Sequence, residues 1–259
     1  MIQWIPLNVP ANELQTILAT FLDVFEHAYA WIAPPHACYL VGTHQRLALD
    51  LALMERQLVQ PSFEGLRRYG WADPASVATL LFADAPAMRR ALSEQSRINS
   101  LEHPLLEFYS PRDFVRPSVQ RANDNMRFFA EMRRFPFDDI TFEGSDPTLE
   151  YAATTKILRL LATISADEAG KQSAAVEELA ELLEAVPTAS ALRYAASDIL
   201  VTSSSNYDPK TETAVLRVAV SLWPDHAGRQ LALGSHLLTS GDAKIAEPAL
   251  RKAVMLNPH

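Results

Sequence analysis

Residues 233–258 read LGSHLLTSGDAKIAEPALRKAVMLNP, and this stretch decides the fold of the last part of the chain. It begins with a Leu-Gly pair, which is followed by small or apolar residues and then by a proline: Leu237, Gly241, Ala246, Leu250, Ala253 and Pro258. Small residues let two helices approach closely, and a proline ends a helix. The stretch therefore predicts two helices that pack closely against each other.

Parts of this pattern recur earlier in the chain. Leu216, Ala219 and Pro224 lie one 34-residue period before Leu250, Ala253 and Pro258 and have the same spacing. One unit further back, the spacing of glycine, alanine, leucine and proline is repeated by Gly170, Ala175, Leu179 and Pro187. The distance from Pro187 to Pro224 is about three residues longer than the 34-residue period. The loop at 203–206 can hold these additional residues.

This register resembles that of tetratricopeptide domains, which bind peptides or partner proteins in a concave groove and carry no chemistry of their own. Gln230 stands where their pattern has a tryptophan. We expect an all-α tetratricopeptide-like array of about three helix pairs over residues 148–259, with a protein or peptide partner in its groove. A generic amphipathic helical bundle is the alternative, and the shared register favours the repeat.

Composition limits the classes of function. The chain has 259 residues, 48% of them hydrophobic, and a net charge of −8 without a long basic run, which disfavours nucleic-acid and anionic-membrane partners. No apolar stretch approaches the ~20 residues that cross a bilayer, and the first residues lack the pattern of a signal peptide. The single cysteine, Cys38, fits a reducing compartment. We expect a cytoplasmic protein.

The first part of the chain has strand and helix patterns. An apolar run at 2–7, ended by Asn8-Val9-Pro10, predicts a buried strand and a turn. A helix with Asn12 as its N-cap is predicted by apolar residues on one helical face: Leu14, Ile17, Leu18, Phe21, Leu22 and Phe25. Strands at 29–33 and 38–43 follow, and their short connection predicts an antiparallel pair.

Residues 45–94 have a helical pattern, and residues 104–109 predict a last strand or extended segment. A helix at 116–134 and a linker at 135–147 are predicted next. Both are charged, through Arg116, Arg121, Arg127, Arg133 and Arg134 in the helix and Asp138, Asp139, Glu143 and Asp146 in the linker. We interpret them as solvated surface in preference to an anion or metal site.

Several segments of residues 1–115 together resemble the C-terminal half of bacterial spermidine-synthase-like proteins. The segments are Gln3-Trp4-Ile5-Pro6-Leu7, Phe21 to Phe25 with Ala30-Trp31-Ile32, Tyr39-Leu40-Val41-Gly42, and Asn99 with Pro104-Leu105-Leu106-Glu107-Phe108 and Pro111-Arg112. The resemblance implies a doubly wound, Rossmann-like α/β lobe of the class I methyltransferase type. It also implies an aminopropyltransferase relative that binds S-adenosylmethionine or its decarboxylated form.

On this alignment the strand at 2–7 corresponds to the family's fifth strand. The first four strands, which carry the glycine-rich cofactor loop and the aspartate that orients the amine, have no counterpart, and the eight glycines form no G-x-G pattern. We expect no catalytic, cofactor-binding or metal-binding residues, with the cofactor site only in a full-length relative. Gln3 and Trp4 are the residues that the resemblance carries over as substrate-lining groups. The alternative, which we favour for Trp4, is a core position beneath the helix.

The expected architecture is a partial Rossmann-like α/β lobe followed by an all-α repeat array, in three parts: residues 1–115, 116–147 and 148–259. We interpret the chain as a non-catalytic protein that binds a partner in the repeat groove. The alternative is the C-terminal part of a spermidine-synthase-like aminopropyltransferase, truncated and active only with its missing N-terminal half. An unpaired strand edge at Ile2–Leu7 predicts self-association or pairing with an upstream segment.

Overall fold

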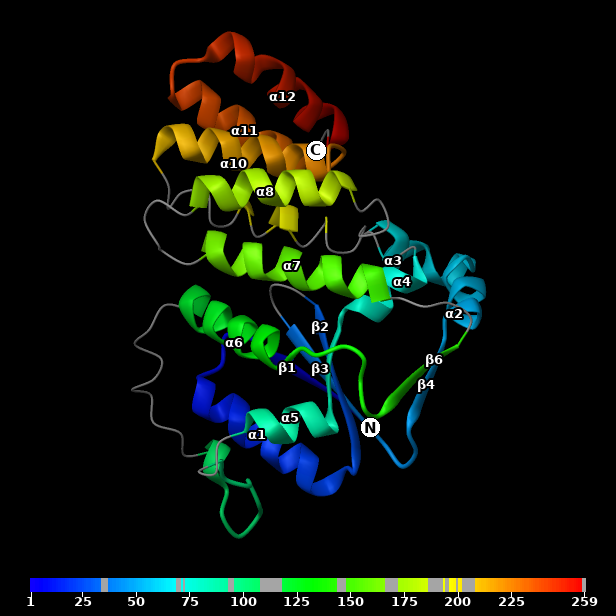
Figure 1. Ribbon diagram of the computed structural model, residues 1–259. Helices are drawn as coiled ribbons and strands as arrows, with labels where there is room; N and C mark the ends of the chain where they lie inside the picture. The colour runs from blue at the N-terminus through cyan, green and yellow to red at the C-terminus, as the bar shows by residue number, and fades with distance from the viewer. Residues whose placement is uncertain are drawn as a thin grey trace. The chain divides into compact units, whose positions relative to one another are not determined.

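The computed structural model describes residues 1–33, 37–68, 71, 73–92, 96–107, 118–143, 148–165, 172–185, 193, 196–198, 200–201 and 208–257. They form a mixed α/β protein with a small sheet and many helices (Figure 1). The chain divides into two compact units, Met1–Thr155 and Lys156–His259. Among the described helices, none combines the length and the hydrophobicity needed to cross a bilayer.

The first unit is built on a four-stranded sheet. Its strands along the chain are β1 (Ile2–Pro6), β2 (His27–Ala33), β3 (Ala37–Thr43) and β5 (Leu81–Asp84). Their order in space is β1-β3-β2-β5, with β3 antiparallel to β1 and β2, and β5 antiparallel to β2. β1 and β2 therefore run parallel, and α1 (Ala11–Val24) connects them. This confirms the predicted order of strand, helix and antiparallel strand pair.

Three helices, α1, α5 (Ala85–Ala91) and α6 (Ser118–Met132), cover one face of this sheet and contact one another (Figure 1). The sheet contributes a row of buried apolar side chains on that face: Ile5, Ala28, Ala30, Ile32, Leu40 and Ala83. Gly42 is required at the end of the layer because a Cβ atom there would lie 2.4 Å from the ring of Phe25.

The opposite face of the sheet is covered over β2 and β5. The buried residues there are Tyr29, Leu81, Phe137, Ile140 and Tyr151. A second, two-stranded parallel sheet of β4 (Leu47–Asp50) and β6 (Ile140–Glu143) packs its partly buried side chains against this cluster. Among the described residues, helices thus cover one side of the main sheet, and the small sheet covers only part of the other side.

Two strands lie in the region that was expected to be helical. α2 (Leu51–Leu58), α3 (Glu64–Arg68) and α4 (Pro74–Thr79) confirm short helices there, but β4 and β5 are strands. All four residues of β5 are buried, so the strand lacks the alternation of apolar and polar residues that marks a half-exposed strand. A short apolar run of this kind cannot be distinguished from a buried helix by periodicity.

Two further local predictions are wrong. α1 begins at Ala11 with Pro10, and not Asn12, in the N-cap position. Leu105–Glu107 form a 3-10 helix where an extended segment was expected. Phe108 and Tyr109 of that segment and the Pro111-Arg112 pair lie outside the described residues.

α6 confirms the predicted helix, although Arg116 is outside the described residues. The interpretation of its arginines as solvated surface is wrong for Arg121 and Arg133, which are both buried. Arg133 lies 4.7 Å from the ring centres of both Phe82 and Tyr151, and burial lowers its pKa to about 10. It stays charged at neutral pH and is stabilised by the two aromatic faces.

The segment predicted as an acidic linker is partly core. Phe137 and Ile140 are buried, and β6 pairs with β4. Of the acidic residues, Asp139 is buried whereas Asp138 is 62% exposed. Residues 144–147, including Asp146, lie outside the part that the structure describes.

The second unit is helical. Its helices are the end of α7 (Thr148–Ser165), then α8 (Gln172–Ala185), α10 (Pro209–Leu222), α11 (Ala227–Thr239) and α12 (Ala243–Leu256). α11 and α12 form the closely packed pair that residues 233–258 predict. Their shared core, together with α10, consists of Leu216, Leu233, Leu237, Ala246 and Ala249.

Several residues of the proposed repeat register are buried as a helical array requires. They are Ala175 and Leu179 in α8, Leu216 and Ala219 in α10, and Ala246 and Ala253 in α12. Gly170, Pro187, Pro258 and the loop at 203–206 lie outside the described residues. The helix pair is therefore confirmed, and the tetratricopeptide-like register remains a prediction.

α11 and α12 approach each other closely at Gly234. A Cβ atom there would lie 2.6 Å from Cγ of Leu250 and 3.2 Å from its backbone nitrogen. We expect Gly234→Ala to lower the free energy of unfolding by about 1–2 kcal/mol, because overpacking outweighs the better helix propensity of alanine. Urea denaturation followed by circular dichroism measures this change.

The matched control is Gly65→Ala in α3, where a Cβ atom meets nothing within 4 Å. This variant should be as stable as the wild type or gain up to about 1 kcal/mol. A Gly234→Ala protein that is as stable as Gly65→Ala would show that the two helices do not approach this closely.

Candidate functional site

The second unit has an exposed apolar stripe on α11. Leu231 and Leu238 are each 53% exposed, and Ser235 lies exposed between them. Residues at these spacings share one face of a helix. The other face of α11 packs on α12 through Leu233, Gly234 and Leu237. The helix thus presents two leucines to solvent while it is held from behind.

Polar contacts fix α11 against α10. His236 contacts Glu212 through Nδ1 at 3.2 Å and the Thr213 hydroxyl through Nε2 at 2.8 Å. Gln230, at the position where the repeat pattern has a tryptophan, is buried and donates to the carbonyl of Pro224 at 2.8 Å. The exposed leucines are therefore carried by a helix whose rotation about its own axis is set from both neighbouring helices.

The start of α10 is also fixed. The side chain of Asp208 accepts hydrogen bonds from the backbone N–H groups of Lys210 and Thr211. Hydrogen bonds from Thr211, followed by that from Lys210, lower the pKa of the Asp208 carboxyl. Asp208 is thus an ionised N-cap at neutral pH.

In the first unit, three side chains from different elements converge on Asp139. His27 Nδ1 lies 2.7 Å from Oδ2, and Arg46 Nε lies 3.0 Å from Oδ1. The Tyr29 hydroxyl donates to Asp139 and accepts the N–H of Leu47 at 2.8 Å. Burial raises the pKa of Tyr29 above its ordinary value, so its proton is retained.

This cluster joins β2, the residues before β4, and the residues before β6. Both carboxylate oxygens of Asp139 and both sides of the Tyr29 hydroxyl are engaged in holding these elements together. We therefore assign it a structural role. The sequence offered no signal for it, because the residues that meet are separated by up to 112 positions along the chain.

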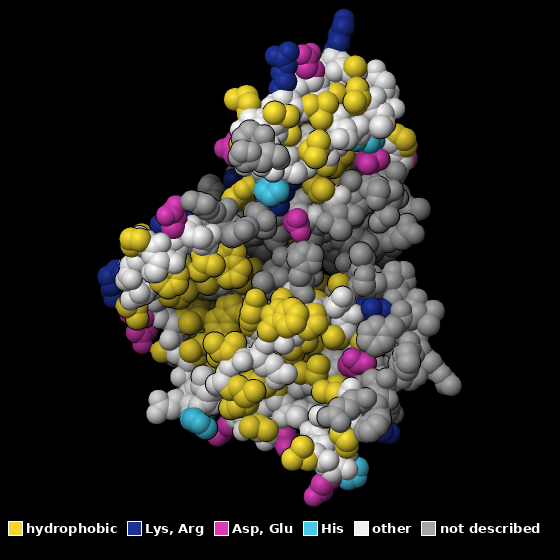
Figure 2. Space-filling model, turned by 180° about the vertical axis from the view of Figure 1, so that it is seen from behind, with side chains coloured by type: hydrophobic (Ala, Val, Ile, Leu, Met, Phe, Trp, Pro, Cys, Tyr) yellow, Lys and Arg dark blue, Asp and Glu magenta, His cyan; other side chains and the backbone are white. Residues whose placement is uncertain are grey.

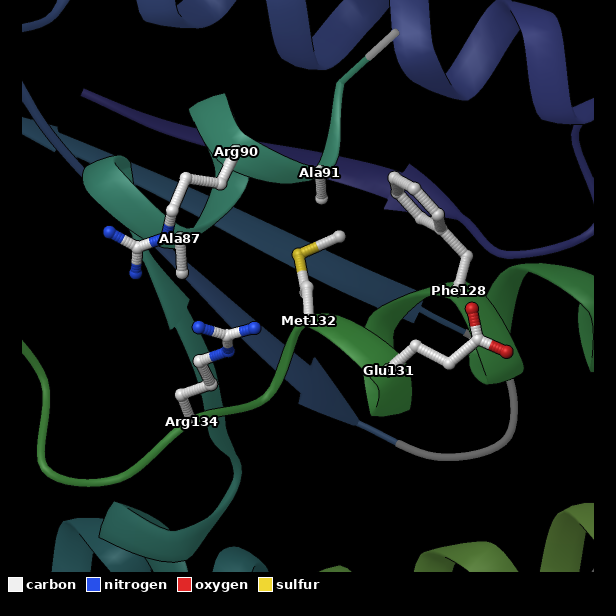
Figure 3. A pocket seen from close by; sticks show the side chains of 7 residues that line it. All are labelled: Ala87, Arg90, Ala91, Phe128, Glu131, Met132 and Arg134. Atoms are coloured by element: carbon white, nitrogen blue, oxygen red, sulfur yellow. The ribbon is translucent and has the colours of Figure 1, made fainter.

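A pocket of about 280 Å³ opens between α5 and α6 (Figure 3). Arg90 and Arg134 lie on one side of it, Glu131 and Phe128 on the other, and Met132 projects between them. Arg90 is also paired with Asp138 at 3.2 Å. A carboxylate opposite two guanidinium groups gives the pocket a mixed charge that selects no class of ligand.

The two residues that the resemblance carried over do not form one site. Gln3 and Trp4 are adjacent on β1, so their side chains lie on opposite faces of the sheet. Gln3 is half-buried, and Trp4 is 58% exposed. The favoured interpretation of Trp4 as a core residue beneath the helix is wrong, because Trp4 lies on the face opposite to α1, near the open edge. A substrate-lining role for either residue remains a prediction.

Residues suited to metal binding are not gathered within the described parts of the chain. No group of three or more His, Cys, Asp or Glu residues there could hold a metal ion. Cys38 is buried, and burial raises the pKa of its thiol, which keeps it protonated.

The chain was compared with known proteins in three ways. No protein-family model matches it, and searches of curated proteins and of solved structures found no match. The resemblances to spermidine-synthase-like proteins and to tetratricopeptide domains therefore remain predictions from the residues.

Replacement of Asp139 tests the converging cluster. We expect Asp139→Asn to lower the free energy of unfolding by about 1–3 kcal/mol, because the variant loses the charge that His27 and Arg46 contact in a buried setting. Asp138→Asn is the matched control, since the carboxylate of Asp138 is exposed and pairs with the exposed Arg90. Equal stability of the two variants in urea denaturation would contradict the structural role.

Proposed function

We propose that the protein is a non-catalytic interaction protein that binds a partner protein or peptide through its helical second unit. The observation that carries the proposal is the stripe of Leu231 and Leu238, held exposed on a helix that is fixed by α10 and α12. Exposed apolar side chains gathered on a rigid surface are typical of protein interaction sites.

The stripe suits an apolar partner segment. Leu231 and Leu238 are seven residues apart, which places them ~10 Å apart along the helix. A partner helix with apolar residues two turns apart, or an extended peptide with alternate apolar side chains, can contact both leucines. The close crossing at Gly234 and the buried alanines of α12 support a tetratricopeptide-like array, in which such a segment lies in a groove.

The first unit supports the resemblance to spermidine-synthase-like proteins through its topology. A strand, a crossover helix and an antiparallel strand pair, with the third strand between the first two, suit one end of a doubly wound sheet. We propose that this unit binds neither S-adenosylmethionine nor its decarboxylated form by itself. The alternative is an aminopropyltransferase lobe that is active only with a further segment.

A photo-crosslinking amino acid at position 231 tests the proposed surface. In extract from the source cells, we expect it to capture a discrete protein that the same amino acid at position 53 does not capture. Leu53 is the matched control because it is a leucine on α2 with 46% exposure. Equal capture at the two positions would contradict the proposal.

The captured protein is then purified and titrated against the wild type, the double variant Leu231→Asp/Leu238→Asp and the control Leu53→Asp. We expect the double variant to bind at least about tenfold more weakly, since charged side chains replace the apolar contacts. The control should bind as tightly as the wild type. Unchanged affinity in the double variant would exclude the α11 stripe as the binding surface.

Isothermal titration with S-adenosylmethionine and with decarboxylated S-adenosylmethionine tests the non-catalytic assignment. We expect no heat of binding from either compound. Tight binding of either one would overturn the assignment and favour the aminopropyltransferase alternative.

A further inference from the structure

An apolar layer runs across one face of the main sheet and becomes steadily more exposed towards β1. Two cross-strand rows form it: Tyr29, Val41 and Ile2, and Trp31, Tyr39 and Trp4. In the first row the exposure rises from 0% at Tyr29 to 71% at Ile2. In the second row it is 38% at Tyr39 and 58% at Trp4.

Figure 2 shows hydrophobic side chains gathered on the face of the first unit that lies behind α1, α5 and α6 in Figure 1. The same layer is buried over β2 and β5, where the Phe137 and Ile140 cluster covers it. The exposed part is therefore the continuation of a core beyond the segment that covers it. Such a continuation is typical of a surface that another chain covers.

The hydrogen-bond pattern of β1 leaves an open edge beside this patch. Met1 and Gly42 exchange both backbone hydrogen bonds, at 2.8 and 2.9 Å. Because bonded pairs alternate along an antiparallel ladder, Gln3 and Ile5 also direct their backbone groups towards β3. Ile2 and Trp4 direct theirs away from β3, and among the described residues no strand pairs with that side.

The open edge is short because the chain is covered soon after Pro6. Asn125 donates to the carbonyls of Leu7 and Val9 at 2.7 and 2.8 Å, and Arg121 donates to that of Asn8. Pro6 itself faces outwards and has no N–H to offer. Among the described residues, the groups open for pairing are thus the N–H and C=O of Ile2 and Trp4, since the C=O of Pro6 accepts the N–H of Val9 at 3.4 Å.

We propose that a second copy of this chain pairs with β1, antiparallel and about a two-fold axis at Gln3. In this register Ile2 of one copy exchanges both backbone hydrogen bonds with Trp4 of the other copy. The two-fold axis repeats this exchange between Trp4 of the first copy and Ile2 of the second. The register that opposes Trp4 with Trp4 is worse, because it sets Ile2 against Pro6, which has no N–H to donate.

A second copy suits this edge better than a charged partner does. Residues 1–10 contain no charged side chain, so no like-charged side chains of this strand oppose each other at the contact despite the net charge of −8. The ammonium group of Met1 is bonded to the carbonyl of Gly42 within the same copy. Pairing also brings Ile2 of one copy beside Trp4 of the other on the exposed face, which extends the apolar layer across the two-fold axis. The edge lacks the charged residues that normally prevent such pairing.

The contact is small. Trp4 alone offers roughly 100–150 Å², and the patch of Met1, Ile2, Trp4 and Tyr39 is below the ~800 Å² per partner of a stable complex. We therefore expect a dimer in rapid exchange with the monomer, with a dissociation constant in the micromolar range.

Sedimentation velocity over about two orders of magnitude in concentration, centred on the micromolar range, tests the proposal. We expect the wild type to shift from monomer to dimer. Ile2→Pro removes an outward N–H without removing a donor to β3, and it should weaken the dimer at least about tenfold. Ile2→Val keeps that N–H and the apolar side chain, so it should dimerise like the wild type. A monomer at all concentrations, or a dimer unaffected by Ile2→Pro, would overturn the proposal.

Disulfide trapping tests the register in a background with Cys38→Ala. The two Gln3 residues face each other across the axis, so Gln3→Cys should form a covalent dimer on mild oxidation. Ile2→Cys should not, because the two copies of residue 2 are offset along the strands. Trapping at residue 2 in place of residue 3 would contradict the register. Leu231→Asp/Leu238→Asp should leave dimerisation unchanged, which separates this interface from the α11 stripe.

Discussion

Two buried carboxylates, Asp84 and Asp139, hold the first unit together. Asp84 ends β5, caps α5 through the N–H of Ala87 at 3.0 Å, and accepts the N–H groups of Asp138 and Asp139 at 2.7 and 3.1 Å. Asp139 in turn binds two side chains of β2, those of His27 and Tyr29, and the side chain of Arg46 before β4. Buried carboxylates are costly unless every lone pair is engaged, so this arrangement allows little variation in where the segment 135–143 lies.

The position of that segment decides which part of the sheet is covered. Phe137 and Ile140 close the core over β2 and β5, and the aromatic rings of Phe135 and Tyr151 stack beside them at 4.5 Å. Among the described residues, this cover reaches Val41 of β3 and leaves Ile2 and Trp4 of β1 exposed. The second unit likewise has an apolar element that is covered on one side, because α12 buries one side of α11 and leaves Leu231 and Leu238 exposed. In both units an apolar surface remains beside a rigid, well-packed layer, and this supports interaction with other chains as the role of the protein.

The sequence predicted the elements whose signals are local. The strand at Ile2, the helix to Val24 and the antiparallel pair follow from apolar spacing and turns, and Gly234 with Ala246 predicted the last helix pair. The features that were missed depend on distant partners. β5 is buried on both faces and has no alternation, and β4 forms only by pairing with β6, about ninety residues further on.

The candidate surfaces were predictable to a similar extent. The unpaired edge of β1 follows from the strand order that the resemblance implied. The exposure of Trp4 does not, because it depends on where the segment 135–143 stops covering the sheet. Arg133 also escaped prediction, since a charged residue in a charged helix reads as surface until Phe82 and Tyr151 are seen to enclose it.

We propose that other chains cover the apolar surface that this fold leaves exposed. Amide hydrogen exchange at β1, read residue by residue by NMR, tests it most directly. Gln3 should be protected at every protein concentration because its N–H faces β3. The amide of Trp4 should become protected only as the concentration rises into the range where copies pair. A Trp4 amide that exchanges freely at every concentration would contradict the claim for this edge.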